Sequence, residues 1–302
     1  MLIIGYVIQA CLQNENDIPI ILINGHAGDH NSLNELLNNI KQDYPNRRVI
    51  AAKILFGTFS SRFMGFSRYI RGVATAIHKA ANGAECVDIV GYSQGGLAGR
   101  AYTQLYSGFK NNYYPQVRKL ISLAGVQGGF YCDVTCVNFT GLTGFFKTTY
   151  RIPSVVYSSS VQMRYTPAAF WRDPYHFETY GRICNTLAQI NGECVDQTVS
   201  TGRERFIRLQ KLYTFYSLTD ETLLPPSSGN FGTYEPVSGK YIDVKDNSVY
   251  KNDNFGLKTL DESGRWVQCR AEVSHGDFAG TAFYKSHVIH ALKGDDSQLV
   301  CK

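Results

Sequence analysis

The chain has 302 residues, of which 44% are hydrophobic, a formal net charge of +5 and an isoelectric point near 8.7. This is enough apolar material for one large core, with or without a sizeable insertion. The lysines and arginines are scattered without a long basic run. That pattern argues against nucleic-acid binding and permits only weak attraction to acidic membrane surfaces. No run reaches about 18 apolar residues, so the sequence predicts no transmembrane segment.

The first half of the chain alternates between strand and helix patterns. Strands are predicted over 19–24, 48–54, 87–90 and 117–123. Helices are predicted over 33–40, 65–81 and from 97 onward. The run 19–24 is continuously apolar, as in a parallel strand that is buried on both faces. The alternation predicts an α/β protein with a mostly parallel, doubly wound central sheet flanked by helices.

The alternation stops near residue 130. Residues 130–205 contain scattered aromatics, prolines and only short helical patterns, so we predict a largely helical insertion over the sheet. Strand patterns return at 211–217 and 265–270, and a last helix is expected over 278–292. We therefore expect one domain over 17–302.

The N-terminus and the cysteines favour a protein of the secretory pathway. Residues 1–16 are expected to be a trimmed signal peptide or a disordered start. The eight cysteines show no zinc-ligand spacing, and Cys132 with Cys136 and Cys184 with Cys194 are typical of small disulfide loops. A glycosylation sequon begins at Asn138. The sequence leaves the pairing of the other four cysteines open: Cys11, Cys86, Cys269 and Cys301.

The most specific motif is G-Y-S-Q-G at 91–95, between an apolar strand and a helix-compatible stretch. In this context G-x-S-x-G is typical of a nucleophile elbow, in which a strained serine sits on a sharp turn between strand and helix. The motif therefore predicts that Ser93 is a nucleophile. The alternative is an ordinary glycine-rich turn.

A serine nucleophile needs a base and an orienting carboxylate, which in this chain order follow it in later loops. His275 lies in a polar loop between the last predicted strand and the last helix. The other histidines precede Ser93, fall in the insertion or share a helix: His26, His30, His78, His176, His287 and His290. Asp220 is the first carboxylate after the strand at 211–217, whereas we expect the adjacent Glu221 to point the other way. We therefore predict His275 as base and Asp220 as its partner.

Two backbone N–H groups should stabilise the oxyanion of the intermediate. One is expected from Gln94, directly after the nucleophile. The other is expected from Ala27, in the glycine-containing loop 25–28 after the first strand. For His26 we expect a role in shaping this loop.

Together these segments resemble the palmitoyl-protein thioesterases, lysosomal serine hydrolases of the α/β-hydrolase fold. The similar segments are ILINGHAGD (21–29), GYSQGGL (91–97), SLAGVQGGF (122–130), FWRDP (170–174) and NFGLKTLD (254–261). His275 follows Gly256 by 19 residues, which is similar to the family's spacing. The chain departs from the family where its oxyanion loop reads N-G-H-A and where His275 precedes Gly-Asp.

The resemblance implies the triad Ser93, Asp220 and His275, an oxyanion hole at Ala27 and Gln94, and a lysosomal or secreted enzyme. Its expected substrates are fatty-acyl thioesters and S-acylated proteins or peptides, with no metal or cofactor required. The insertion would form part of an acyl groove, although its aromatic residues could equally be ordinary core: Phe145, Phe146, Tyr157, Tyr165, Phe170 and Trp171. The rival functions are an acyl-CoA thioesterase or lipase of other acyl preference, and a non-catalytic lipid-binding protein.

Overall fold

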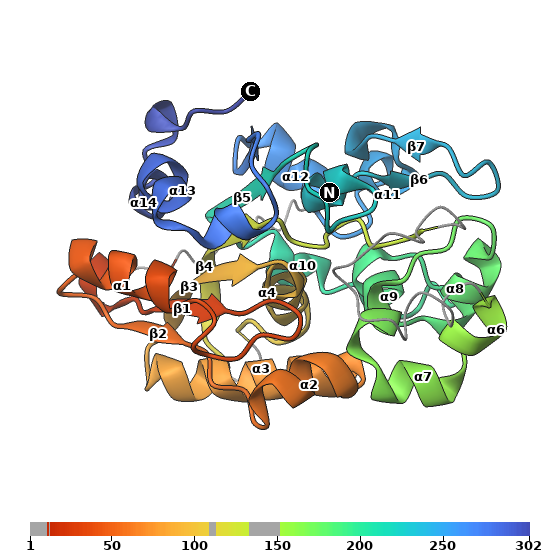
Figure 1. Ribbon diagram of the computed structural model, residues 1–302, viewed down its shortest axis with the longest axis horizontal. Coiled ribbons are helices and arrows are strands. Elements are labelled where there is room, and N and C mark those ends of the chain that lie inside the picture. The colour runs from red at the N-terminus through yellow and green to blue at the C-terminus, as the bar shows by residue number, and fades with distance from the viewer. Residues whose placement is uncertain (1–10, 12, 109–112, 133–151) are drawn as a thin grey trace, which may run out of the picture.

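The computed structural model describes residues 11, 13–108, 113–132 and 152–302, and the account below concerns these residues. Its centre is a parallel sheet with the strand order β2-β1-β3-β4-β5-β8 (Figure 1). The strands are β1 Ile20–Ile23, β2 Val49–Ala51, β3 Cys86–Tyr92, β4 Gln116–Leu123, β5 Lys211–Tyr216 and β8 Trp266–Arg270. All neighbouring pairs are parallel. The predicted fold class, an α/β protein with a mostly parallel sheet, is therefore confirmed.

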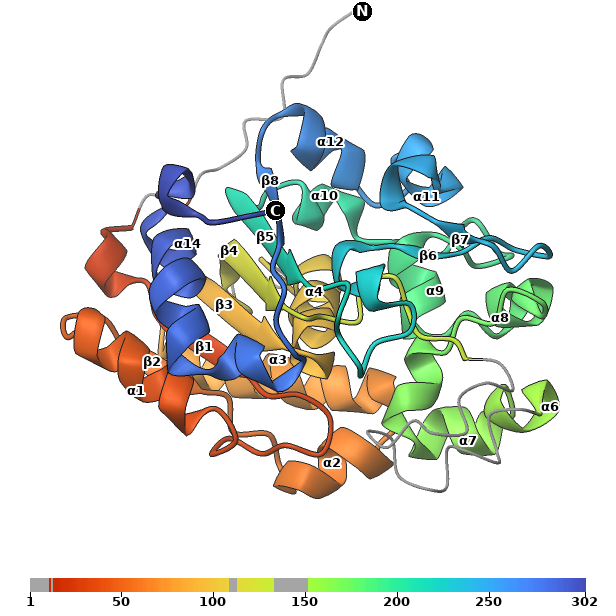
Figure 2. The ribbon, with the colours of Figure 1, turned by 45° about the horizontal axis from the view of Figure 1, so that its top comes forward.

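Helices cover both faces of the sheet. Helix α1 (Asn34–Asp43) and the C-terminal helices lie on one face, and α3 (Phe66–Ala81) and α4 (Gln94–Leu105) lie on the other (Figure 2). The C-terminal run consists of α13 (Thr281–Phe283), a π-turn η7 (Tyr284–Val288) and α14 (Ile289–Lys293). A short 3₁₀ turn, η6 (Gly276–Ala279), precedes it, so the last helix begins later than the predicted residue 278.

Between β4 and β5 the described chain forms short helices. These are α6 Pro153–Val156, α7 Ser159–Arg164, η3 Thr166–Phe170, α8 Phe177–Ile183, α9 Thr186–Asn191 and α10 Arg203–Phe206. After β5 come η4 Pro226–Asn230, a small hairpin of β6 Thr233–Tyr234 and β7 Tyr241–Ile242, η5 Val244–Asp246, α11 Ser248–Lys251 and α12 Leu257–Glu262. The boundaries of the predicted insertion stay a prediction, because residues 133–151 lie outside the described part.

Helix α2 (Gly57–Phe63) was not predicted, and the strand expected over 48–54 is only β2. Strand β2 is an edge strand that pairs with β1 alone, and their ladder ends where Ala51 meets Leu22. Among the described helices, none has the length and apolar character to cross a lipid bilayer.

Within the part of the chain that the structure describes, three disulfides join Cys11–Cys86, Cys184–Cys194 and Cys269–Cys301. The predicted Cys184–Cys194 loop is confirmed, and the structure supplies the two pairings that the sequence left open. Cys136 and the sequon at Asn138 lie outside the described residues, so the Cys132–Cys136 pair stays a prediction.

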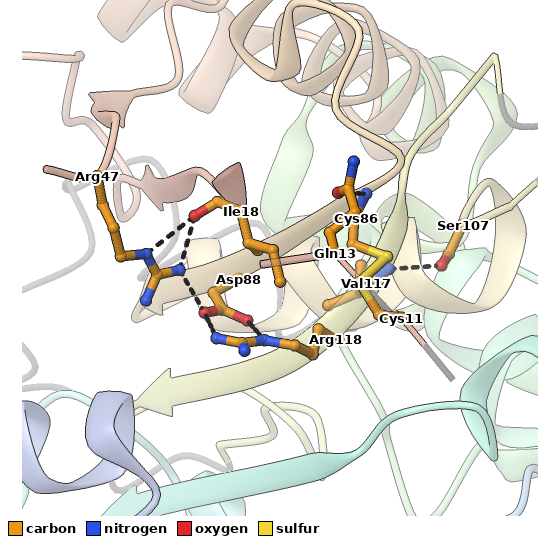
Figure 3. Close-up of a disulfide and its surroundings, with 9 residues drawn as sticks. All are labelled: Cys11, Gln13, Ile18, Arg47, Cys86, Asp88, Ser107, Val117 and Arg118. Carbon is orange, nitrogen blue, oxygen red and sulfur yellow. Dashed lines mark hydrogen bonds and ion pairs between the residues drawn. A yellow bond between two sulfur atoms is a disulfide. The ribbon is translucent and has the colours of Figure 1, made fainter. Parts of the chain in front are cut away.

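The amino end of β3 is anchored by the Cys11–Cys86 disulfide and by a buried ion cluster (Figure 3). Asp88 is fully buried and accepts hydrogen bonds from Arg47 (2.7 Å) and Arg118 (2.9 Å). Burial opposes ionisation of Asp88, but these two guanidinium groups outweigh it and lower its pKa. The cluster therefore holds β1, β3 and β4 together at the end of the sheet opposite Ser93.

Candidate active site

Ser93 lies on the turn between β3 and α4. Its backbone has φ 55° and ψ −124°, which is a strained conformation for a residue with a side chain. The bracketing glycines are required by close packing: a Cβ on Gly91 would lie 2.4 Å from the Gly95 carbonyl oxygen, and one on Gly95 would lie 2.1 Å from the Ile23 carbonyl oxygen. The G-x-S-x-G segment therefore has the sharp turn that the motif predicts.

Asp220 and His275 come together from the loops after β5 and β8. The Asp220 Oδ2 atom lies 2.7 Å from His275 Nδ1, and both residues are buried. The other carboxylate oxygen of Asp220 accepts the backbone N–H groups of Thr222 (2.8 Å) and Leu223 (3.0 Å). These two bonds fix the carboxylate, which in turn can fix the imidazole with Nδ1 protonated and Nε2 free to accept a proton.

The expectation that Glu221 points away from His275 is wrong. Glu221 Oε2 accepts a hydrogen bond from the backbone N–H of His275 at 3.2 Å, so both carboxylates face the same residue. The reason is local: the segment turns back on itself, with Asp220 N–H on the Ser217 carbonyl, instead of running extended. The two carboxylates differ in what they contact, since Asp220 holds the ring and Glu221 holds the backbone.

Tyr92 connects the histidine loop to the elbow. Its hydroxyl donates to the His275 carbonyl oxygen at 3.2 Å, and the two rings lie 5.2 Å apart. Burial and then the nearby Asp220 carboxylate raise the pKa of Tyr92, so its hydroxyl stays protonated as a donor. Tyr92 is the variable residue of G-x-S-x-G, and nothing in the sequence singles it out.

The loop after β1 passes directly against Ser93. A Cβ on Gly25 would lie 3.0 Å from Ser93 Cβ. The Asn24 side chain closes the loop by donating to the carbonyl oxygens of Gly25 (3.0 Å) and Gly28 (2.6 Å). Ala27 has φ 61°, in the left-handed region, where its N–H direction differs from that of an extended chain.

His26 joins this loop to two helices. Its Nδ1 lies 3.3 Å from Gln94 Oε1 and 3.2 Å from the Ser61 carbonyl oxygen, and Gln94 Nε2 donates to the same Ser61 oxygen at 3.1 Å. Burial, with a contribution from the charge of Arg62, lowers the pKa of His26 to about 4. The ring is therefore neutral near pH 7. Helix α2, which carries Ser61, is a part of the site that sequence reasoning missed.

Four of the aromatic residues considered for the acyl groove are described by the structure, and they belong to the core. Each is at most 6% exposed: Tyr157, Tyr165, Phe170 and Trp171. The Phe170 ring meets that of Phe66 on α3 edge-on at 6.0 Å, which packs the insertion onto the sheet layer. Phe145 and Phe146 lie outside the described residues, so their part in an acyl groove stays a prediction.

A parallel sheet with a serine on a strained strand-to-helix turn and a histidine–carboxylate pair after later strands defines an α/β-hydrolase. The crystal structure of Aspergillus fumigatus lipase B supports this fold, with a TM-score of 0.53 at 13% identity over 93% of this chain and 55% of that chain.

The palmitoyl protein thioesterase family model matches residues 19–275. Palmitoyl-protein thioesterase 3 of Dictyostelium discoideum is 31% identical over 86% of this chain and 85% of its own length. Lysosomal thioesterase PPT2 of Bos taurus is 30% identical over 90% and 84%, respectively. The chain therefore belongs to the palmitoyl protein thioesterase family, as the sequence motifs predict.

Proposed function

We propose that this enzyme hydrolyses thioesters between a long fatty acyl chain and a cysteine of a protein or peptide. The observation that carries the proposal is the 2.7 Å contact between Asp220 and His275, which is tied through Tyr92 to the Ser93 elbow. Family membership supports a thioester as the bond that is cleaved. The name of the relatives, palmitoyl-protein thioesterase, supports a long fatty acyl chain as the acyl group.

In the proposed acylation step, His275 Nε2 takes the proton of the Ser93 hydroxyl as its oxygen attacks the thioester carbonyl. Asp220 keeps the imidazole in the required tautomer and stabilises the imidazolium that forms. The carbon–sulfur bond then breaks, and the imidazolium proton passes to the departing sulfur, directly or through solvent, so that His275 is neutral again for the second step. Because a thiolate is a good leaving group, protonation by His275 matters less here than it would for an oxygen ester.

The oxyanion of the tetrahedral intermediate is assigned to the N–H groups of Gln94 and Ala27. The Gln94 N–H lies at the start of α4, where it has no partner within the helix and can donate to a substrate. The left-handed backbone at Ala27 and the contact of Gly25 with Ser93 support the second donor. Water activated by His275 then attacks the acyl-enzyme and releases the fatty acid and free Ser93.

A fluorophosphonate probe tests the nucleophile. Wild type should be labelled, Ser93→Ala should not, and Ser238→Ala, an exposed serine of the β6–β7 hairpin, should be labelled like wild type. If folded wild type is not labelled, the rival of a lipid-binding protein without catalysis is favoured. If Ser93→Ala is still labelled, the serine assignment is wrong.

The substrate is tested by comparing kcat/KM for palmitoyl thioesters, short-chain acyl thioesters and palmitoyl oxygen esters. Palmitoyl thioesters of peptides should be cleaved fastest. If oxygen esters are cleaved far faster, the enzyme is a lipase or esterase. If acyl-CoA is strongly preferred over acylated peptides, it is an acyl-CoA thioesterase.

We further propose that the enzyme acts in the lysosome. Three disulfides within the described residues are typical of the oxidising secretory pathway, and relatives are named as lysosomal. Fractionation of cells that produce the chain should place it with lysosomal markers, whereas recovery in the cytosol would contradict the proposal.

A further inference from the structure

The outer side of α2 exposes a cluster of large apolar side chains. They are 49–71% exposed, and we call them the α2 face: Leu55, Phe56, Phe59, Phe63 and Met163. The Phe59 and Phe63 rings lie 5.5 Å apart, Leu55 and Phe56 line one groove, and the Gly65 N–H just after α2 donates to the Met163 carbonyl oxygen at 2.9 Å. In both ribbon views α2 lies at the outer edge of the molecule (Figures 1 and 2).

Folding alone does not account for this face. The side chains that α2 buries are Ser60 and Ser61, so two polar side chains point inward while its two phenylalanines point outward. Phe56 has φ 66°, a conformation that disfavours a bulky residue, and its ring is 67% exposed. An exposed aromatic on a strained backbone gains little from folding, and contiguous exposed apolar patches of this kind mark binding surfaces.

The positive charge of the chain is concentrated in the segment that contains β2, α2 and α3. Residues 47–84 contain seven Lys or Arg and no Asp or Glu, so with a total of +5 the rest of the chain carries −2. Arg47 is buried against Asp88. The other six are exposed or, for Arg62, partly exposed, and none has an ion-pair partner among the described residues: Arg48, Lys53, Arg62, Arg68, Arg71 and Lys79.

A groove of about 800 Å³ continues from the α2 face between β2 and α3. Leu55 and Phe56 belong to both the face and the groove, and Lys53 and Lys79 line its walls. One carboxylate, Asp29, also lines the groove, but it accepts hydrogen bonds from Asn31 N–H and from the Ser32 hydroxyl. The lining is thus largely apolar, with three cationic side chains, Arg48, Lys53 and Lys79, against one carboxylate.

We propose that the α2 face and this groove dock on a bilayer that contains anionic phospholipids. Phenylalanines that enter the interface while cations meet lipid phosphates are the combination that holds a peripheral protein on such a surface. The exposed apolar side chains favour a membrane over an acidic protein as the partner, because binding to an acidic protein would require only the positive charges. The inner side of α2 contacts the oxyanion loop, where Ser61 Oγ donates to the Gly28 carbonyl oxygen at 3.2 Å. Docking would therefore place the site beside the lipid surface.

The test is co-sedimentation of the full chain with vesicles, which needs no turnover and so is independent of the proposed hydrolysis. Wild type should bind vesicles of equal parts phosphatidylcholine and phosphatidylglycerol, and bind pure phosphatidylcholine much less. Replacing Lys53 and Lys79 by Gln should weaken binding about thirtyfold, or about fivefold for each cation. Phe56→Ser with Phe59→Ser should weaken it at least about tenfold.

The matched control is Val237→Ser, which removes an apolar side chain that is still more exposed (85%) from the β6–β7 hairpin and should bind like wild type. All four substituted side chains of the test variants are exposed, and unchanged circular dichroism would show that they fold. Equal binding of wild type to both vesicle types refutes the proposal. So does wild-type binding by the Phe56→Ser, Phe59→Ser variant, which would indicate a purely ionic surface suited to an acidic protein.

Discussion

Asp220→Asn is the sharpest test of the proposed machinery, because it changes one atom in a site whose contacts are fixed. The carboxylate has two separate tasks: Oδ2 meets His275 Nδ1, and Oδ1 accepts the N–H groups of Thr222 and Leu223. An asparagine of the same shape can serve the backbone only if its NH₂ group faces the imidazole. That NH₂ group then forces the tautomer in which Nε2 is protonated and cannot accept the Ser93 proton.

The asparagine amide of this variant has a second possible orientation, whose free-energy cost can be compared with that of the first. Turning the asparagine so that its oxygen faces His275 would leave the N–H groups of Thr222 and Leu223 without acceptors and opposed to an NH₂ group. At about 1–3 kcal/mol for each unsatisfied buried group, the turn costs roughly 2–6 kcal/mol. The wrong tautomer should therefore dominate. We expect kcat to fall about 10⁴-fold, an increase of about 5 kcal/mol in the barrier.

The assay is release of free thiol from a palmitoyl thioester, measured with a chromogenic disulfide reagent. Glu221→Gln is the matched control, because it neutralises the neighbouring carboxylate, which contacts only the backbone N–H of His275 among the described hydrogen bonds. It should keep kcat within about tenfold of wild type. The reasoning is refuted if Asp220→Asn keeps more than a tenth of the activity, or if Glu221→Gln loses as much.

Three further variants probe the support of the site. The pKa of His26 is lowered from 6.5 to about 4, so between these values the unfolded chain binds a proton that the folded chain does not. On going from pH 7 to pH 5, protonation of His26 in the unfolded chain should lower the free energy of unfolding of wild type by about 2 kcal/mol. His26→Gln should lack this loss, as measured by urea unfolding. Arg100 is fully buried, lies 4.0 Å from the Phe255 ring centroid and donates to the Ile190 carbonyl oxygen, so Arg100→Met should cost about 3 kcal/mol or more by the same method. Gly95→Ala places a methyl group against the β1 backbone and should abolish soluble, folded protein in expression trials.

The controls for these variants use residues in open surroundings. Arg182 forms an exposed pair with Glu178, and Arg182→Met should cost at most about 0.5 kcal/mol. Gly276→Ala, next to the proposed base, meets nothing within 4 Å and should fold like wild type. A parallel pH dependence of wild type and His26→Gln would contradict a buried, neutral His26. A soluble Gly95→Ala enzyme would show that the elbow is looser than its packing indicates.

The elements that the sequence predicted well are those whose burial leaves a simple pattern. The continuous apolar run of β1 is buried on both faces, and the amphipathic spacing of α3 ends at an asparagine in the left-handed conformation. Helix α2 was not predicted because its pattern is inverted, with serines facing the core and phenylalanines facing outward. A pattern that assumes apolar residues face the core cannot detect a helix whose apolar side faces outward.

The part of the candidate site that could be predicted is the part that chain order and the chemistry of the loops determine. Those rules selected Asp220 and His275, which the structure brings into contact. They could not foresee Glu221 or Tyr92, because both contact the backbone of His275 and a backbone contact leaves no motif. The link between His26 and Ser61 was equally hidden, since it depends on α2 packing against the oxyanion loop.

Strand β3 shows how the fold can keep a strained serine in place. Its amino end is held by the Cys11–Cys86 disulfide and by the two guanidinium groups on Asp88, and its carboxyl end carries Ser93. Backbone strain at a single residue costs roughly 1–3 kcal/mol, whereas removing one partner of a buried ion pair costs about 3–5 kcal/mol. Loss of one partner in the ion cluster would therefore cost more than the strain at Ser93. It follows that changes at Asp88 should lower stability without altering the pH dependence of kcat, while changes at Ser93 should remove catalysis and leave stability unchanged or improved.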